Sequence, residues 1–174
     1  MKQWKPSPFF RACRLVLRVQ IILGLIIFCY NYFFQDNLGV MVLVYVGWLV
    51  GLTGLAFFIR STYELKKKGR SLKGKSFLLT SVLVDNGIYA IIRHPEYLGS
   101  MLLVLGSILI SQHWLTLVLG VPVLLWFFVY VLPTEDRHLI EKFGDDYKRY
   151  MQTVPGLNFV VGIMQLKKHK KEGG

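Results

Sequence analysis

The stretch Gly87-Ile-Tyr-Ala-Ile-Ile-Arg-His-Pro-Glu-Tyr-Leu-Gly99 decides how the rest of the chain is interpreted. A proline ring disfavours helical backbone in the residue before it and suits the first turn of a helix. We therefore expect Arg93 and His94 in extended chain and Pro95 at the start of a helix. Glu96 then falls in the first turn, where an acidic side chain suits the helix dipole. The stretch predicts a cation and an imidazole at a helix N-terminus, where backbone N–H groups favour anions.

Two tyrosines flank this pair, Tyr89 before it and Tyr97 after it, and the chain beyond is almost wholly apolar up to Gln112. Such a helix can enter a bilayer. An interfacial anchor would explain an isolated Arg or Tyr here, because both side chains favour the membrane boundary. The cluster of Arg, His and Pro at one helix start favours a binding site instead.

The composition indicates a small polytopic membrane protein. Hydrophobic residues make up 53% of the 174 residues, and Lys and Arg outnumber Asp and Glu by 21 to 10. The basic residues separate apolar runs and do not coat one soluble face, so we expect no nucleic-acid partner. Cys13 and Cys29 lie too far apart on one predicted helix to pair. The histidines and cysteines show no metal-ligand spacing, so we expect no metal site.

Four apolar segments predict an all-α fold with about four transmembrane helices. They span about 15–34, 38–59, 95–112 and 114–132. All 21 Lys and Arg residues lie at or before the start of the first segment, between the second and third, or after the fourth. By the positive-inside rule, both termini and the long middle loop face the cytosol. In the second segment Gly47, Gly51 and Gly54 share one helix face and predict close packing on another helix.

The polar region after the fourth segment is patterned. Leu139, Phe143, Tyr147 and Met151 recur every four residues, which predicts an amphipathic C-terminal helix along the cytosolic interface. Gly144 interrupts the pattern, so the helix is expected to break there, with Asp145 capping a second piece.

Glu135 and Asp136 stand at the start of this predicted helix. Because the third segment begins on the same side of the membrane, we expect the acidic pair to meet Arg93 and His94, although about forty residues separate them. The alternative is that the two acids only satisfy a helix N-terminus.

Two further features are assigned to the membrane surface. Residues 69–76 match the phosphate-loop pattern, but there is no room for the α/β sheet that this pattern needs, so they are interpreted as a basic loop facing headgroups. The apolar run 77–84 is too short to cross a bilayer and predicts at most a re-entrant piece. The chain has no Gly-x-Gly, which excludes the usual glycine-rich cofactor turn of soluble nucleotide-binding domains.

Three motifs together resemble a known superfamily. The central stretch, the sequence Pro-Thr-Glu-Asp at 133–136, and Phe-Gly-Asp-Asp-Tyr-Lys-Arg-Tyr at 143–150 with Val-Pro-Gly-Leu at 154–157 are similar to the isoprenylcysteine carboxyl methyltransferase and phospholipid N-methyltransferase superfamily. The resemblance covers roughly the C-terminal half. It implies a multi-pass membrane enzyme that takes S-adenosylmethionine from the cytosol and methylates a lipid-borne or lipophilic acceptor.

The resemblance also implies site residues. The candidate cofactor-binding residues are Tyr89, Arg93, His94, Pro95, Tyr97, Glu135 and Asp136, and the candidate catalytic residues are Arg93, His94 and Glu135. Residues 1–174 are then one membrane-embedded domain, with a two-span region and basic loop at 1–75, a cofactor-binding core at 76–160 and a basic tail at 161–174. The tail is expected to bind anionic lipid headgroups.

The chemistry of the cofactor suits these side chains. Arg93 and the helix N-terminus suit its carboxylate, the acidic pair its ammonium or ribose hydroxyls, and either tyrosine its adenine or its sulfonium. A carboxylate acceptor needs no base, whereas an ammonium acceptor must lose a proton, which His94 or one of the acids can take.

Alternatives remain for the methyl acceptor and for the class of enzyme. Isoprenylcysteine enzymes often carry an arginine shortly before the acidic pair, where this chain has Tyr-Val-Leu-Pro at 130–133, and the second acid here is Asp136 rather than Glu. Carboxylate and amine acceptors both stay open. Membrane sterol and enone reductases, which use NADPH, share the Arg-His-Pro-x-Tyr element, and a non-catalytic membrane protein of the same fold is a third reading.

Overall fold

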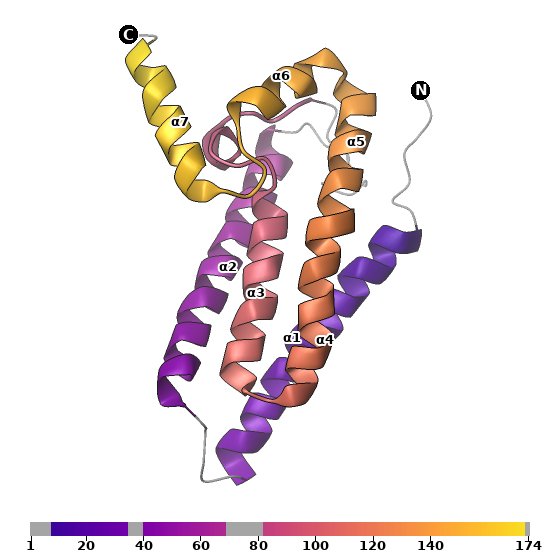
Figure 1. Ribbon diagram of the computed structural model, residues 1–174, viewed down its shortest axis with the longest axis vertical. Helices are drawn as coiled ribbons and strands as arrows, with labels where there is room; N and C mark the ends of the chain where they lie inside the picture. Colours follow the sequence, from indigo (N-terminus) through magenta and orange to yellow (C-terminus); the bar gives the residue numbers. More distant parts are fainter. Residues whose placement is uncertain (1–7, 35–39, 69–81, 173–174) are drawn as a thin grey trace. The chain divides into compact units, whose positions relative to one another are not determined.

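The structure is a computed structural model that describes residues 8–34, 40–68 and 82–172. These residues form helices joined by short connections, with no strand among them, which confirms the all-α prediction (Figure 1). The elements are α1 (Pro8–Phe34), α2 (Met41–Lys68), the 3-10 turn η1 (Gly87–Ala90), α3 (Pro95–Ser111), α4 (Trp114–Trp126), the π-helical turn η2 (Phe127–Val131), α5 (Leu132–Phe143), α6 (Asp145–Thr153) and α7 (Phe159–Glu172). The basic loop at 69–76 and most of the short apolar run at 77–84 lie outside the described residues, and the described part of that run, 82–84, is not helical.

Two continuous helical stretches are long and apolar enough to cross a membrane, Met41–Lys68 and Trp114–Phe143. Only 17% and 33% of their most apolar windows are buried, which is typical of lipid-facing helices and not of the core helices of a soluble protein. The second stretch has 30 residues. At the standard rise it is about 45 Å long, against about 30 Å of bilayer hydrocarbon. Its charged end, from Pro133 onward, therefore extends beyond the membrane-spanning part. The helical stretches Arg18–Tyr30 and Pro95–Ser111 are apolar but shorter, so the count of four spans stays a prediction.

The helix continues from α4 through Pro133 into α5 without a break, and Glu135 falls in the first turn of α5, as predicted. Val131, directly before α5, has helical backbone angles of φ −67° and ψ −50°. The π-helical turn η2 joins α4 to α5 without a break, and such turns absorb one extra residue inside a helix. Pro133 falls at the start of α5.

The described chain divides into two compact units. The first comprises described residues within 1–56 and 99–129, and the second those within 57–98 and 130–174. In the first unit α2 and α3 lie side by side with their backbones close (Figure 1). A Cβ atom added at Gly54 would lie 2.7 Å from the carbonyl oxygen of Gly99, and one at Gly47 would lie 2.9 Å from the backbone nitrogen of Ile110. The predicted glycine-mediated packing is confirmed at these two positions, whereas an added Cβ at Gly51 would meet open space.

The second unit has its own apolar core. Tyr147, Tyr150 and Val154 are buried there, and they are packed against Leu83, Leu139, Ile140, Phe143 and Met151. The stripe that was predicted to lie on the membrane interface therefore faces the interior of this unit. The reason is the break at Gly144, which is confirmed: its φ of +61° turns α6 back on α5. Gly144 itself takes the N-cap position, so Asp145 does not cap α6, and its carboxylate lies 2.8 Å from Nζ of Lys148 instead.

Candidate functional site

Arg93 and His94 are held in place by backbone hydrogen bonds to a distant segment. The N–H of Arg93 donates to the carbonyl oxygen of Pro155 at 3.0 Å, and the N–H of His94 donates to that of Gly156 at 3.1 Å. Pro95 opens α3 as predicted. The pair lies outside any helix, and its backbone is fixed by the connection between α6 and α7.

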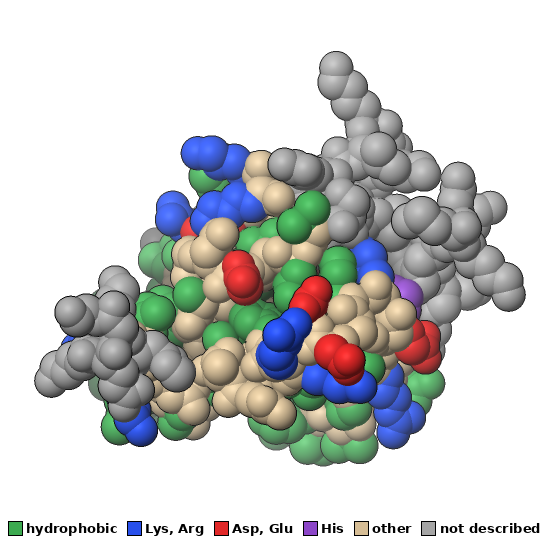
Figure 2. Space-filling view, turned by 90° about the horizontal axis from the view of Figure 1, so that it is seen from above, with side chains coloured by type: hydrophobic (Ala, Val, Ile, Leu, Met, Phe, Trp, Pro, Cys, Tyr) green, Lys and Arg blue, Asp and Glu red, His purple; other side chains and the backbone are tan. Residues whose placement is uncertain are grey.

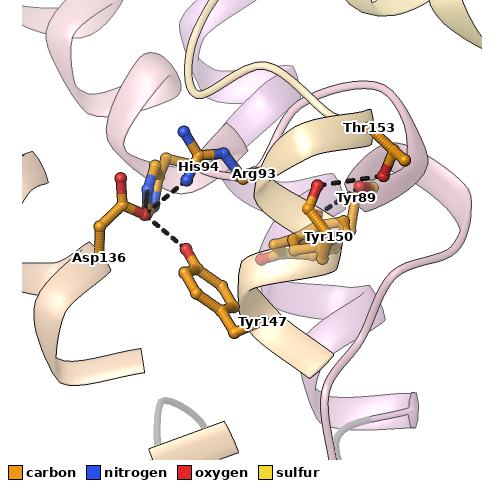
Figure 3. Close-up of polar contacts among 7 residues, drawn as sticks. All are labelled: Tyr89, Arg93, His94, Asp136, Tyr147, Tyr150 and Thr153. Atoms are coloured by element: carbon orange, nitrogen blue, oxygen red, sulfur yellow. Dashed lines mark hydrogen bonds and ion pairs between the residues drawn. The ribbon is translucent and has the colours of Figure 1, made fainter. Parts of the chain in front are cut away.

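The side chains of Arg93 and His94 converge on Asp136 of α5 (Figure 3). Nη1 of Arg93 and Nε2 of His94 each lie 2.9 Å from Oδ1 of Asp136, and the hydroxyl of Tyr147 donates to the same oxygen at 2.5 Å. A carboxylate only accepts, so Nε2 of His94 carries a proton in this arrangement. The His94 and Arg93 side chains are only 4% and 12% exposed. The structure thus brings Arg93, His94 and Asp136 together, although about forty residues separate them in the sequence.

The charges in this cluster are set by their neighbours. Burial alone would raise the pKa of Asp136, but the hydrogen bond and charge of His94, together with Tyr147 and Arg93, hold it below its ordinary value. Burial raises the pKa of the Tyr147 hydroxyl, and the nearby Asp136 carboxylate raises it further. At neutral pH Asp136 is therefore charged and Tyr147 keeps the proton that it donates.

A small cavity of about 80 Å³ lies beside this cluster. Its lining consists of Leu65, Tyr89, Arg93, His94, Pro95, Glu96, Tyr97, Glu135 and Leu139. Six of the seven predicted cofactor-binding residues are among them, and Asp136 is not. The structure therefore separates the acidic pair: Glu135 faces the cavity, whereas one oxygen of Asp136 is taken up by three protein donors.

Two polar groups in the cavity wall, the carboxylate of Glu135 and Nε of Arg93, are not fully compensated by protein partners among the described residues. Burial raises the pKa of Glu135, against the lowering effects of His94, His138 and a hydrogen bond with Tyr97. Nε of Arg93 is buried and has no hydrogen-bond partner among the described residues. A half-buried carboxylate that is costly to ionise suits a ligand that supplies a cation, and a guanidinium edge without an acceptor suits one that supplies an anion.

Glu64 of α2 supports the cavity wall, and the sequence analysis missed it. Its side chain is only 2% exposed, and its carboxylate lies 2.9 Å from Nε of Arg60 and 3.1 Å from Nζ of Lys68. It also accepts the backbone N–H of Ile88 at 3.3 Å, which fixes η1 and with it Tyr89. The available signal was a single acid with a cation four residues away on each side, just after the second predicted span.

Tyr147 and Tyr150 were also missed as site residues. Tyr147 was interpreted as part of an interfacial stripe, and Tyr150 lay outside that pattern. Tyr147 bonds to Asp136, and the hydroxyl of Tyr150 donates to the backbone carbonyl of Tyr89 (Figure 3). Neither contact follows from the sequence until the reversal at Gly144 is known.

A larger groove of about 770 Å³ lies between α6, α7 and the segment 82–90. Asp85, Arg149 and Leu166 are among its lining residues. Figure 2 looks along the long axis from the end that carries α6, where acidic and basic side chains are mixed with hydrophobic ones. Tyr150 lines this groove and Tyr89 lines the small cavity, so the hydrogen bond between them joins the walls of the two spaces.

A protein-family model matches more than half of the chain. The model of the phospholipid methyltransferase family matches residues 42–146 of this chain. The chain belongs to this family. The match includes Arg93, His94 and both acids of the site, and it ends one residue before Tyr147.

This member of the phospholipid methyltransferase family has named relatives that are protein-S-isoprenylcysteine O-methyltransferases. The protein-S-isoprenylcysteine O-methyltransferase of Schizosaccharomyces pombe is 38% identical over 74 residues, which is 42% of this chain and 31% of the relative. The enzyme of the same name from Saccharomyces cerevisiae is 38% identical over 80 residues, 45% of this chain and 34% of the relative. A probable one from Oryza sativa subsp. indica is 31% identical over 124 residues, 65% of this chain and 63% of the relative.

The matched region spans about a third of the two yeast relatives. No solved structure gives a significant match to the chain. The family and these relatives support neither the reductase alternative nor the non-catalytic one.

Proposed function

We propose that this protein is an integral membrane methyltransferase that uses S-adenosylmethionine and methylates a lipid-borne or lipophilic acceptor. One observation carries the proposal: the cavity beside Asp136 pairs the buried, unpartnered Nε of Arg93 with the half-buried carboxylate of Glu135. The amino-acid end of S-adenosylmethionine carries a carboxylate and an ammonium, which are the two charges that these groups lack. The membership of the methyltransferase family supports the same cofactor.

In this proposal each residue has a separate role. Arg93 binds the cofactor carboxylate, Glu135 binds the ammonium, and Tyr97 or Tyr89 contacts the adenine or the sulfonium. Asp136 is a positioning residue, because its contacts orient the guanidinium of Arg93 and the imidazole of His94. When bound, the cofactor supplies an electrophilic methyl group, and the protein's task is to hold acceptor and donor in line.

The cavity has to widen to take the whole cofactor. Its volume of about 80 Å³ is well below the roughly 300–1,000 Å³ of typical small-molecule sites. Leu65 and Leu139 in its lining are apolar side chains that can change rotamer without breaking a hydrogen bond of the site. Cofactor binding is therefore expected to involve a conformational step of this wall.

We further propose a four-pass topology with both termini and the cavity on the cytosolic side. The two long apolar stretches are joined in this proposal by α1 and α3 as shorter spans. The placement of all Lys and Arg residues on one side of these four spans supports the orientation.

For the acceptor, the isoprenylated cysteine carboxylate is the first candidate, because the named relatives are protein-S-isoprenylcysteine O-methyltransferases. A phospholipid amine is the second candidate. The matching family is the phospholipid methyltransferase family, and no arginine stands just before the acidic pair. The two differ in proton demand. An amine must lose a proton before it attacks. Nε2 of His94 already carries a proton that it donates to Asp136, so Glu135, which lines the cavity, is the candidate base in this proposal.

The test is binding and turnover by the full chain in lipid nanodiscs. We expect labelled S-adenosylmethionine to bind, and Arg93→Ala to weaken its binding by roughly 10- to 100-fold, the range for a lost hydrogen bond to a charged group. Arg93→Lys keeps the charge but not the planar fork, so it should recover only part of the affinity. Methyl-labelled cofactor with an isoprenylcysteine analogue or phosphatidylethanolamine then identifies the acceptor. Binding of NADPH instead, or unchanged affinity in Arg93→Ala, would refute the proposal.

A further inference from the structure

The outward face of α7 has an unusual composition. All of its exposed described side chains are Val160, Val161, Met164, Lys167 and Lys168. At 3.6 residues per turn these five positions fall within about a third of the helix circumference. The face is therefore apolar in its first half and cationic in the turn that follows.

The apolar half is strongly exposed. Val160, Val161 and Met164 are 67%, 37% and 65% exposed, whereas the opposite face of the helix packs on the rest of the unit. Gly162 on that inner face lies against the backbone of Ile91. Three adjacent apolar side chains left in water are unfavourable, which points to a surface that covers them.

The start of α7 lies at the depth where α2 changes from apolar to charged. The ring of Phe159 packs edge-to-face on Phe57 of α2, with centroids 5.3 Å apart. Phe57 belongs to the last apolar turn of α2, and Arg60 is the first charged residue after it. Because α2 is long and apolar enough to cross a membrane, this position marks the bilayer boundary.

We propose that α7 docks on an anionic bilayer surface, with Val160, Val161 and Met164 inserted at the level of the headgroups and Lys167 and Lys168 bound to anionic lipid. A helix with this combination of apolar and basic side chains is typical of membrane-surface helices. A second copy of the chain is a poorer occupant, because a symmetric contact brings the same face to itself, and the exposed described residues of this face include no acid to pair with Lys167 and Lys168. The inference requires a membrane-embedded chain but does not depend on the methyl-transfer proposal.

The test measures the depth of α7 in the reconstituted full chain. Cys13 and Cys29 are replaced by serine, and a spin label is attached at Met164→Cys or, as the control, at Lys148→Cys on the exposed side of α6. Accessibility to oxygen and to a polar nickel chelate is measured in nanodiscs of phosphatidylcholine alone and of phosphatidylcholine with phosphatidylglycerol.

We expect the label at 164 to be oxygen-accessible and shielded from nickel when phosphatidylglycerol is present, and the label at 148 to stay nickel-accessible. Lys167→Gln with Lys168→Gln should lower the ratio of inserted to displaced helix by roughly 30-fold, from about 1 kcal/mol for each lysine near an anionic surface. The proposal fails if position 164 matches position 148. It also fails if the label is shielded from both reagents, which indicates a protein contact, or if insertion is the same in both bilayers.

Discussion

The carboxylate of Glu64 lies where residue 87 would carry a Cβ atom. Gly87 has a φ of +67°, and a Cβ added there would overlap the carboxylate of Glu64. The same carboxylate accepts the N–H of Ile88. The glycine and the buried acid are therefore one structural unit, which holds η1 and Tyr89 against α2.

Gly87→Ala should destabilise the protein and weaken cofactor binding, because an L-residue is strained at this φ and its Cβ displaces Glu64. In a Glu64→Ser background the overlap is absent and only the backbone strain remains. We expect the two substitutions to be non-additive by about 0.5–3 kcal/mol in the free energy of unfolding. Thermal unfolding in detergent of the two single variants and the double variant measures this coupling, and equal losses in both backgrounds would contradict it.

Glu135→Gln should stabilise the apo protein while it weakens cofactor binding. Burial raises the pKa of Glu135, so its charged form is disfavoured in the folded state and costs stability at pH values above the raised pKa. The advantage of glutamine should be present at neutral pH and should disappear as the pH falls through that pKa. Thermal unfolding against pH, with cofactor titration at pH 7, shows both effects. A variant that is less stable than wild type at pH 7 would argue against an uncompensated carboxylate.

Asp136→Asn should have the opposite effect on stability. The pKa of Asp136 is held below its ordinary value by its donors, so its ionisation stabilises the folded protein above the ordinary carboxyl range, and this contribution is lost as the pH falls through the lowered pKa. We expect a loss of about 1.5–3 kcal/mol at neutral pH, the range for one hydrogen bond to a charged group. The same pH series is the measurement. Equal responses of the Asn and Gln variants would mean that the two acids do not differ in role.

Tyr147→Phe and Tyr150→Phe form a matched pair. Each removes one buried hydroxyl, but Tyr147 donates to a charged carboxylate and Tyr150 to a backbone carbonyl. We expect losses of about 1.5–3 kcal/mol and 0.5–1.5 kcal/mol in the free energy of unfolding, respectively. Chemical unfolding in mixed micelles ranks them, and the reverse order would show that the contact of Tyr147 with Asp136 is not charge-assisted in solution.

Gly54→Ala and Gly51→Ala test the close approach of α2 and α3. An added Cβ at 54 would lie 2.7 Å from a backbone oxygen, so we expect a loss of about 1–3 kcal/mol. An added Cβ at 51 would meet open space, and alanine should there gain about 0.5–1 kcal/mol from helix propensity. Thermal unfolding of the two variants should shift in opposite directions, and shifts of the same sign would contradict the packing.

The sequence predicted local backbone features best. The rule for residues before proline placed Arg93, His94 and the start of α3 correctly, and the four-residue periodicity with Gly144 located the break between α5 and α6. These features depend on local backbone preferences, which short stretches of sequence encode directly.

The contacts that sequence could not predict are those set by chain reversal. Once α6 turns back, the stripe that suggested a membrane face becomes a core, and Tyr147 reaches Asp136. The division of the acidic pair also depends on helix phase: neighbouring residues point in different directions, so Glu135 faces the cavity while Asp136 faces the donors. Periodicity alone cannot tell an interior from a lipid surface, because both reward the same apolar side chains.

The backbone bonds from Arg93 and His94 to Pro155 and Gly156 have a consequence for biogenesis. During synthesis the ribosome completes the segment that fixes these two residues only about sixty residues after making them. The nascent chain can insert its long apolar helices first, but the cluster around Asp136 acquires its geometry only after residues 155 and 156 have been made.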